Sequence, residues 1–382
     1  MNPDAVVQGE PAQRDRLECI DGIRGWAALM VVFSHLWGQF AKHVVPLYDH
    51  PVLRAISDGH LAVLIFFVLS GVALSLRFVR KPQPVSIVGL VAARYVRLVV
   101  PILGTTLIVY LLIFFGVAGS SEAARLANSE IFAGARHGMQ TTMGNVLSFS
   151  FYSVLFDYIP RNTFNWSLWT MPIEFVGSLF IFALLFLFSK LPRLGQFHRM
   201  MIVCMLTIGL LIISKQLAAC FTAGYVLAEL VHSPEGLRKL MPLVSILFMA
   251  ASFVLRAVAG KHDDGSYALL AIGGVMAVLF WPAAKRFFSN GLSRWLGRVS
   301  FPLYLIHVPV IGALGGLYVA LLDHKIAADL ATHITVVVAL ASCLISARLL
   351  LPMEALSIQW SRTAGRLRLP WWPGMPKRTA AE

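Results

Sequence analysis

The first apolar segment of the chain carries an arginine and a histidine that could do chemistry together. The stretch DGIRGWAALMVVFSHLWGQF runs from Asp21 to Phe40. On an α-helix, the step from Arg24 to His35 leaves the two side chains about 20° apart in rotation and about 16 Å apart along the axis. The two residues therefore share one helix face, and that face suits a ligand with an anionic head and a long, thin arm.

Ionisable side chains inside an apolar helix are costly, and by default they mark a functional site that faces the interior of a helix bundle. His35, with Ser34 beside it, favours a general base or a nucleophile. A structural hydrogen bond between helices is the alternative for His35. Arg24 favours anion binding, although an arginine near the end of a span also serves as an interfacial anchor. Asp21 opens the same stretch and is a further candidate.

A second polar intrusion lies in the segment NWSLWTMPIEFVGSLF. Glu174 enters a helix whose next dozen residues are almost wholly apolar, so it could act as an acid or base or could orient a histidine. A favourable interaction with the positive N-terminus of the helix is the alternative. Trp169 ends a run of aromatic residues that could stack on sugars or form an interfacial belt.

Two further segments hold candidate residues. His307 lies inside the apolar segment LGRVSFPLYLIHVPV, with Tyr304 one turn before it, and could be functional or structural. Arg94 and Arg97 are neighbours at i and i+3 on one helix face. Two guanidinium groups in this arrangement could hold phosphates, and anchoring to the membrane is the simpler account.

The composition requires a membrane environment for these helices. The chain is 58% hydrophobic and 13% charged, and its mean hydropathy is +0.73. Such a chain is too apolar for a soluble globular protein and predicts an all-α, polytopic integral membrane protein. We expect about ten transmembrane helices, over residues 24–41, 60–79, 98–118, 169–189, 200–214, 216–232, 241–259, 267–284, 299–322 and 331–351.

The positions of lysine and arginine predict the orientation. Most of the 32 basic residues fall on one set of alternate connections, which places both termini in the cytoplasm. We expect a cytoplasmic segment 1–23, a single transmembrane domain 24–351 with an outer loop at about 119–168, and a cytoplasmic tail 352–382.

The net charge of +13 follows from anchoring to anionic membrane lipid, and some of the cations could also bind an anionic cytoplasmic substrate. Nucleic acid is not an expected partner because no basic soluble domain is present. The four cysteines form no CxxC pair and no metal-ligand spacing, so we expect neither a disulfide framework nor a metal site.

Taken together, the motifs resemble the acyltransferase three family of integral membrane acyltransferases. DGIRGWAALMVVFSH is similar to its opening motif, in which ten residues separate an arginine from a histidine. FFVLSGVALSLRF is similar to its second helix, WTMPIEF to its tryptophan-hydroxyl-glutamate motif, and GRVSFPLYLIHVP to its tyrosine-leucine-histidine motif. Where many members have an adjacent arginine pair, this chain has Ala93 and Arg94.

The resemblance implies an enzyme that moves an acyl group, usually acetyl, from cytoplasmic acyl-CoA to a hydroxyl group. The implied acceptor is a carbohydrate, often a cell-surface or exported glycan, and the implied location is the cell membrane. Arg24, Arg94 and Arg97 would bind the phosphates of acetyl-CoA or another acyl-CoA. His35 would be the base, or would carry the acyl group transiently, and Glu174 would orient it. Proteins of polysaccharide assembly or export are implied partners.

A secondary transporter or flippase for a glycan-type substrate is the rival interpretation, because ionisable residues in many helices would also suit a transport pathway. Transporters commonly show inverted repeats, and the sequence contains no convincing internal repeat. The residue types determine neither the acceptor nor the choice between acetyl, succinyl and longer acyl groups.

Overall fold

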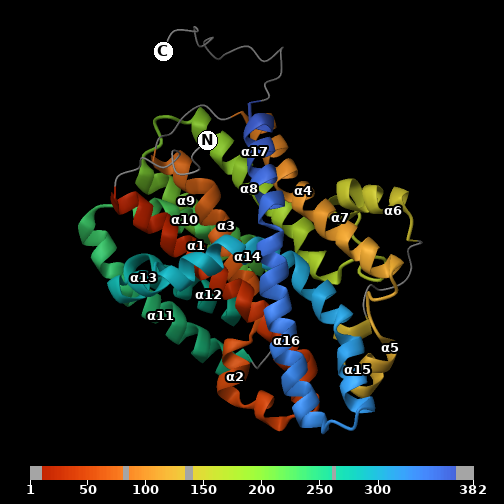
Figure 1. The fold of residues 1–382 in the computed structure, drawn as a ribbon. Coiled ribbons are helices and arrows are strands. Elements are labelled where there is room, and N and C mark those ends of the chain that lie inside the picture. The colour runs from red at the N-terminus through yellow and green to blue at the C-terminus, as the bar shows by residue number, and fades with distance from the viewer. Residues whose placement is uncertain (1–10, 81–85, 134–140, 260–263, 367–382) are drawn as a thin grey trace.

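The computed structural model describes residues 11–80, 86–133, 141–259 and 264–366 of the 382-residue chain. All regular elements in these ranges are helices, which confirms the all-α prediction (Figure 1). The longer helices are α1 (Pro11–Phe33), α3 (Gly59–Arg80), α4 (Ile87–Phe114), α8 (Thr170–Lys190), α9 (Gln196–Ile212), α10 (Gln216–Val231), α11 (Glu235–Ala259), α12 (Asp264–Phe280), α14 (Gly291–Ala313), α15 (Gly315–Asp323), α16 (Ala328–Leu349) and α17 (Leu351–Ala364). The shorter ones are α2 (Pro51–Ile56), α5 (Ser121–Leu126), α6 (Met143–Ser148), α7 (Val154–Phe156) and α13 (Pro282–Phe288).

Within the described residues, seven helical stretches are long and apolar enough to cross a membrane. The pair α12 and α13 would provide an eighth, with a bend of 92° between them. The fifth and sixth predicted spans correspond to α9 and α10, which are apolar but shorter. The protein is therefore a polytopic membrane protein, and the number of ten crossings stays a prediction.

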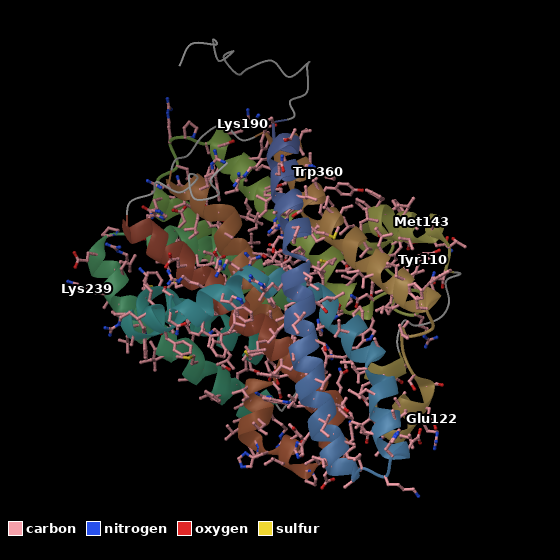
Figure 2. The ribbon with its side chains drawn as sticks, in the orientation of Figure 1. Tyr110, Glu122, Met143, Lys190, Lys239 and Trp360 are labelled. Atoms are coloured by element: carbon pink, nitrogen blue, oxygen red, sulfur yellow. The ribbon has the colours of Figure 1, made fainter. Side chains whose placement is uncertain are left out.

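The two ends of the helix bundle carry different segments. Figure 2 shows Lys190, at the end of α8, and Trp360, in α17, near one end of the molecule, with Glu122 of α5 near the opposite end. The predicted orientation requires this separation, because it assigns Lys190 and Trp360 to the cytoplasmic side and Glu122 to the other. The orientation itself and the predicted domain boundaries stay predictions.

Helices α1 and α14 lie in close contact because glycines meet at their crossing. A Cβ atom placed on Gly25 would lie 2.4 Å from the backbone nitrogen of Gly297, so neither position has room for a side chain. Small residues allow this approach of helix backbones in a membrane, where close van der Waals packing drives helix association. The contact brings the first apolar segment beside the segment that contains Tyr304 and His307.

The apolar core has two parts, and α1 and α14 contribute to both. The larger part is formed mainly by α3, α4, α8, α10 and α12, and the smaller part lies between α14, α15 and α16. Along α1, Ala27 and Val31 belong to the larger part, whereas Ala28 and Val32 belong to the smaller part. Polar residues on α1 and α14 are consequently held between two packed regions.

An apolar helical stretch, Met143–Phe156, lies within the predicted outer loop. The Tyr95 hydroxyl donates a hydrogen bond to the Phe151 carbonyl at 2.7 Å, and the Phe156 ring meets Phe175 edge-on with centroids 5.7 Å apart. Tyr95 lies about 28 Å along the axis from the last residue of α4. This stretch therefore reaches back along α4 and α8 and packs against both.

Candidate active site

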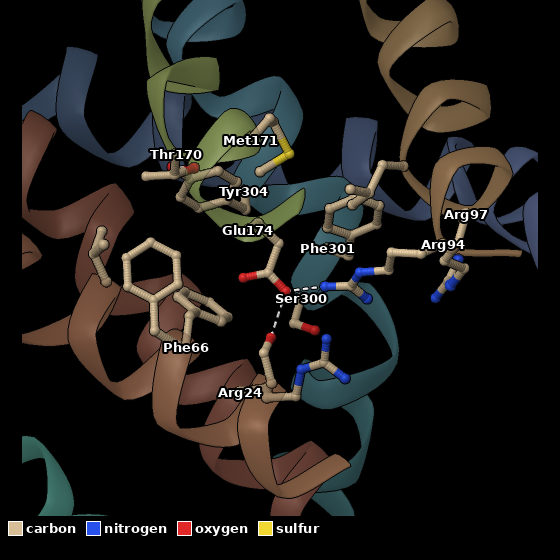
Figure 3. Close-up of a pocket in the computed structure, with 14 residues that line it drawn as sticks. Arg24, Phe66, Arg94, Arg97, Thr170, Met171, Glu174, Ser300, Phe301 and Tyr304 are labelled. Carbon is tan, nitrogen blue, oxygen red and sulfur yellow. Dashed lines mark hydrogen bonds and ion pairs between the residues drawn. The ribbon is translucent and has the colours of Figure 1, made fainter. Parts of the chain in front are cut away.

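Three arginines and a glutamate meet in a space that we name the inner cavity. Its empty volume is about 630 Å³. Figure 3 shows Arg24, Arg94 and Arg97 at one end of it and the rings of Phe66 and Tyr304 at the other. The lining residues are Arg24, Val63, Phe66, Phe67, Ser70, Arg94, Arg97, Leu98, Thr170, Met171, Glu174, Ser300, Phe301 and Tyr304. The cavity thus has a cationic end and an aromatic end.

Glu174 is the central acceptor of the inner cavity. Its Oε1 atom accepts a hydrogen bond from the Ser70 hydroxyl at 2.5 Å and forms an ion pair with Arg94 (Figure 3). The Arg94 and Glu174 side chains are only 15% and 12% exposed. Removing one member of such a pair would leave the other charge uncompensated at a desolvated position.

The other two arginines differ in their partners. The Arg97 guanidinium donates to Glu354 at 2.7 Å and to Ser357 at 2.5 Å, and both acceptors belong to α17. Arg24 forms no hydrogen bond or ion pair with the residues that the structure describes, although it faces the same cavity. Arg24 is therefore the arginine that an anion could reach without displacing a carboxylate.

The outer cavity is a second space, with an empty volume of about 870 Å³. Two histidines and two tryptophans line it, and its lining includes no arginine. Its lining residues are Val31, Ser34, His35, Gly38, Gln39, Gly59, His60, Val63, Trp166, Ser167, Trp169 and Tyr304. Polar hydrogen-bonding groups beside aromatic faces suit a ligand with hydroxyl groups.

His35 lies in the outer cavity at a break in helix geometry. The segment Ser34–Phe40 is a π-helix that follows α1 directly, and short π segments are frequent at functional sites. The His35 ring stacks on His307 with centroids 5.0 Å apart and meets Trp166 edge-on at 4.8 Å. Its Nδ1 atom has no hydrogen-bond partner in the described part of the chain. Ring contacts fix this imidazole, and its unpartnered Nδ1 atom is itself buried.

His307 is fully buried, and its contacts determine its tautomer. Its Nδ1 atom lies 2.7 Å from the Tyr304 carbonyl oxygen. Because a carbonyl only accepts hydrogen bonds, Nδ1 carries the proton and a neutral ring has its lone pair on Nε2. That Nε2 atom has no partner among the described residues. His307 therefore supports the His35 ring by stacking and lines neither the inner nor the outer cavity.

A wall that includes Tyr304 and Val63 separates the two cavities, since both residues line each of them. The Tyr304 hydroxyl donates to the Ser167 carbonyl at 2.8 Å and lies 2.7 Å from the Thr170 hydroxyl. Since its single proton is used by Ser167, Thr170 is the donor in the second bond. These bonds hold the ring in place between the two cavities.

The structure brings together most of the residues singled out in the sequence. Arg24, Arg94, Arg97 and Glu174 line the inner cavity, and Ser34, His35 and Trp169 line the outer one. Asp21 lines neither cavity. The expected contact between Glu174 and His35 is not formed, because Glu174 binds Arg94 and Ser70 and the two residues line different cavities.

Several site residues escaped the sequence analysis. Ser70 lies within the second-helix motif, but its partner Glu174 is 104 residues away. His60 lines the outer cavity and contacts Asp264 with its Nε2 atom 3.3 Å from a carboxylate oxygen. In the sequence, Glu354 is an acidic residue three positions after the last predicted span, and Ser357 follows it at i+3. That pattern was the one sequence signal for the partners of Arg97.

Within the described ranges, no group of three or more histidine, cysteine, aspartate and glutamate side chains is placed to hold a metal ion. The expectation of a metal-free site stays a prediction.

Comparison with known proteins identifies the family. A family model described as an acyltransferase domain matches residues 17–351, nearly the whole chain. The chain belongs to the acyltransferase three family. It is also similar to the O-acetyltransferase PaAT-1 of Phomopsis amygdali, with 23% identity over 372 residues that cover 78% of this chain and 72% of that protein. No solved structure shows a significant match.

Membership in the acyltransferase three family decides between the two classes that the sequence left open. The chain is a membrane O-acyltransferase. The enzyme therefore requires an acyl donor and an acceptor. The two adjoining cavities are the candidate places for them.

Proposed function

We propose that this acyltransferase takes an acyl group, normally acetyl, from cytoplasmic acyl-CoA and places it on a hydroxyl group of a carbohydrate at the cell membrane. The observation that carries the proposal is the placement of Arg24 and His35 in adjoining cavities that share Val63 and Tyr304. Arg24 forms no ion pair or hydrogen bond with the described residues, and the buried Nδ1 atom of His35 has no hydrogen-bond partner among them.

In this proposal the phosphates of the donor bind at the cationic end of the inner cavity. Arginine is well suited to phosphate because its planar guanidinium forms paired, charge-assisted hydrogen bonds. The pantetheine arm is long and uncharged, which suits the aromatic end of the inner cavity, and it must pass the wall at Val63 and Tyr304 to reach His35. The thioester carbonyl would then lie beside His35, while CoA stays on the arginine side.

The acceptor binds in the outer cavity, where Trp166 and Trp169 offer ring faces and His60 and Gln39 offer polar groups. His35 removes the proton from the acceptor hydroxyl as its oxygen attacks the thioester carbonyl. The new C–O bond forms, the C–S bond breaks, and the proton on His35 passes to the departing thiolate. Alternatively, His35 attacks the thioester first and holds the acyl group as an acyl-imidazole before the acceptor arrives.

The test is acetyl-CoA thiol release by the purified protein in lipid discs, with a panel of soluble glycosides as acceptors. We expect acceptor-dependent thiol release that falls at least roughly 100-fold in His35→Ala, the usual contribution of a general base. His324→Ala, which changes an exposed histidine at the end of α15, should retain the wild-type rate. A fully active His35→Ala protein would refute both versions of the mechanism.

A further inference from the structure

Arg97 differs from Arg24 because a carboxylate already occupies it. We propose that the Glu354 carboxylate of α17 occupies the hydrogen-bond donors of Arg97 that a donor phosphate would otherwise bind. Helix α17 would then set the affinity of the inner cavity for the donor. This inference rests on the proposed acyl-CoA donor. It makes Glu354 a positioning residue that competes with the ligand.

The contact between α17 and Arg97 has two parts. Glu354 Oε1 accepts from one guanidinium nitrogen at 2.7 Å, and the Ser357 hydroxyl accepts from the other at 2.5 Å. Ser357 in turn donates to the Glu354 carbonyl at 2.8 Å. A carboxylate and a hydroxyl in this arrangement engage both arms of the guanidinium fork, which a phosphate would engage with two oxygens.

Helix α17 is fixed close to α4, which carries Arg97 (Figure 1). A Cβ atom on Gly104 would lie 2.2 Å from the sulfur of Met353, near the end of that flexible side chain, so α4 and α17 are in direct contact here. Met353 is the neighbour of Glu354 in the sequence. The contact between α4 and α17 brings the Glu354 carboxylate within hydrogen-bond distance of Arg97.

The two carboxylates that pair with arginines of the inner cavity are not equally displaceable. Arg94 and Glu174 are 15% and 12% exposed, and Ser70 adds a second hydrogen bond to the carboxylate. Arg97 and Glu354 are 26% and 16% exposed. Because water screens and solvates a more exposed ion pair, its opening costs less. A phosphate entering the cavity would exchange with Glu354 before it exchanges with Glu174.

Helix α17 also lies almost wholly beyond the matched acyltransferase domain, which ends at Leu351, the first residue of this helix. The competing carboxylate thus lies three residues beyond the matched range, within the continuous helical stretch Ala328–Ala364. Donor affinity could then be adjusted through α17 without changing a residue that touches the reacting groups.

The decisive variant is Glu354→Gln, which removes the charge and keeps the size and the hydrogen-bonding oxygen. We expect the dissociation constant of acetyl-CoA, measured by equilibrium titration in lipid discs, to fall roughly five- to tenfold, at the lower end of the usual range for coupling free energies. The maximal turnover should not change. Glu235→Gln, at an exposed glutamate paired with Lys239, is the matched control and should bind like the wild type.

A second background separates competition from a purely structural role of Glu354. In Arg97→Ala protein, Glu354→Gln should no longer tighten binding, because the competition has no shared cation. Ser357→Ala should tighten donor binding less than Glu354→Gln, since it removes a neutral acceptor and no charge.

The outcomes distinguish this inference from the proposed function. If the wild type fails to bind acetyl-CoA, the proposed donor is wrong and the inference falls with it. If the wild type binds but Glu354→Gln binds equally or more weakly, only the inference is overturned. Tightening that persists in the Arg97→Ala background would likewise overturn it.

Discussion

The inner and outer cavities adjoin each other yet contain opposite kinds of chemistry. The inner cavity has three arginines, two of them paired with carboxylates from α8 and α17. The outer cavity has two histidines and two tryptophans and no arginine. Charge that binds a ligand is therefore kept apart from the imidazole that would do the reaction, with Tyr304 between them.

This separation has a physical reason. A protonated arginine beside His35 would favour the neutral imidazole but would also repel the imidazolium that a general base becomes. Placing a cation about three helix turns earlier, at Arg24 of α1, retains anion binding without that repulsion. Four predictions test the difference between the two cavities, from the largest free-energy effect to the smallest.

Removing the Glu174 carboxylate should affect stability most. In Glu174→Ala, the Arg94 guanidinium would remain in a largely buried position without its counter-ion, at a cost of about 3–5 kcal/mol. The thermal unfolding midpoint in detergent should fall clearly below that of a Glu235→Ala control. An unchanged midpoint would show that Arg94 finds another partner and that Glu174 is not a structural centre of the inner cavity.

Arg24→Ala should act on donor binding and leave stability nearly unchanged. Loss of a charge-assisted hydrogen bond of about 1.5–3 kcal/mol predicts a rise in the donor KM of roughly 10- to 100-fold. Turnover at saturating donor should persist. Arg54→Ala, at an exposed ion pair with Asp49, is the control, and an unaltered donor KM in Arg24→Ala would contradict the role of the inner cavity.

His307→Phe should lower kcat and leave the donor KM unchanged, the reverse of what we expect for Arg24→Ala. The phenyl ring can still stack on His35, but the hydrogen bond from Nδ1 to the Tyr304 carbonyl is lost. We expect kcat to fall about tenfold, equivalent to about 1.4 kcal/mol of barrier, with the donor KM unchanged. A rise in donor KM alone would mean that His307 belongs functionally to the inner cavity.

Tyr304→Phe should have the smallest effect. It removes the hydrogen bonds to Ser167 and Thr170 and keeps the ring, so we expect about 1 kcal/mol of destabilisation. A looser wall should also raise the ratio of thioester hydrolysis to acyl transfer. The ratio is measured as thiol released against acylated glycoside formed, and a constant ratio would exclude a sealing role for the hydroxyl.

The parts of the site that lie on one helix could be predicted from the sequence. Arg24 and His35 are related by helix geometry alone, and the apolar spans follow from hydropathy. Their positions inside apolar segments marked Glu174 and His307 as candidates, and the family resemblance then matched both to its motifs. The structure places all four residues at two adjoining cavities or, for His307, directly behind one of them.

The partners across helices could not be predicted, because they depend on how the helices pack. Glu174 was expected to orient His35, yet the packing of α3, α4 and α8 gives it Ser70 and Arg94 instead. Arg97 and its partner Glu354 are 257 residues apart. A single sequence carries no record of such pairings, whereas periodicity within a helix is local and visible.

The predicted outer loop shows the same limitation at the level of an element. Met143–Phe156 is too short to be recognised as a span. Its apolar side chains pack against α4 and α8, which the sequence alone does not place beside it. Hydropathy over a window of about twenty residues therefore misses it.

The most direct test of the account compares donor binding with turnover in two variants of α1. Acetyl-CoA affinity and acceptor-dependent thiol release would be measured on the same lipid-disc preparations of Arg24→Ala and His35→Ala. We predict that Arg24→Ala weakens binding at least about tenfold, whereas His35→Ala binds like the wild type and has lost transfer. Loss of binding in His35→Ala, together with normal binding in Arg24→Ala, would contradict the division of labour between the two cavities.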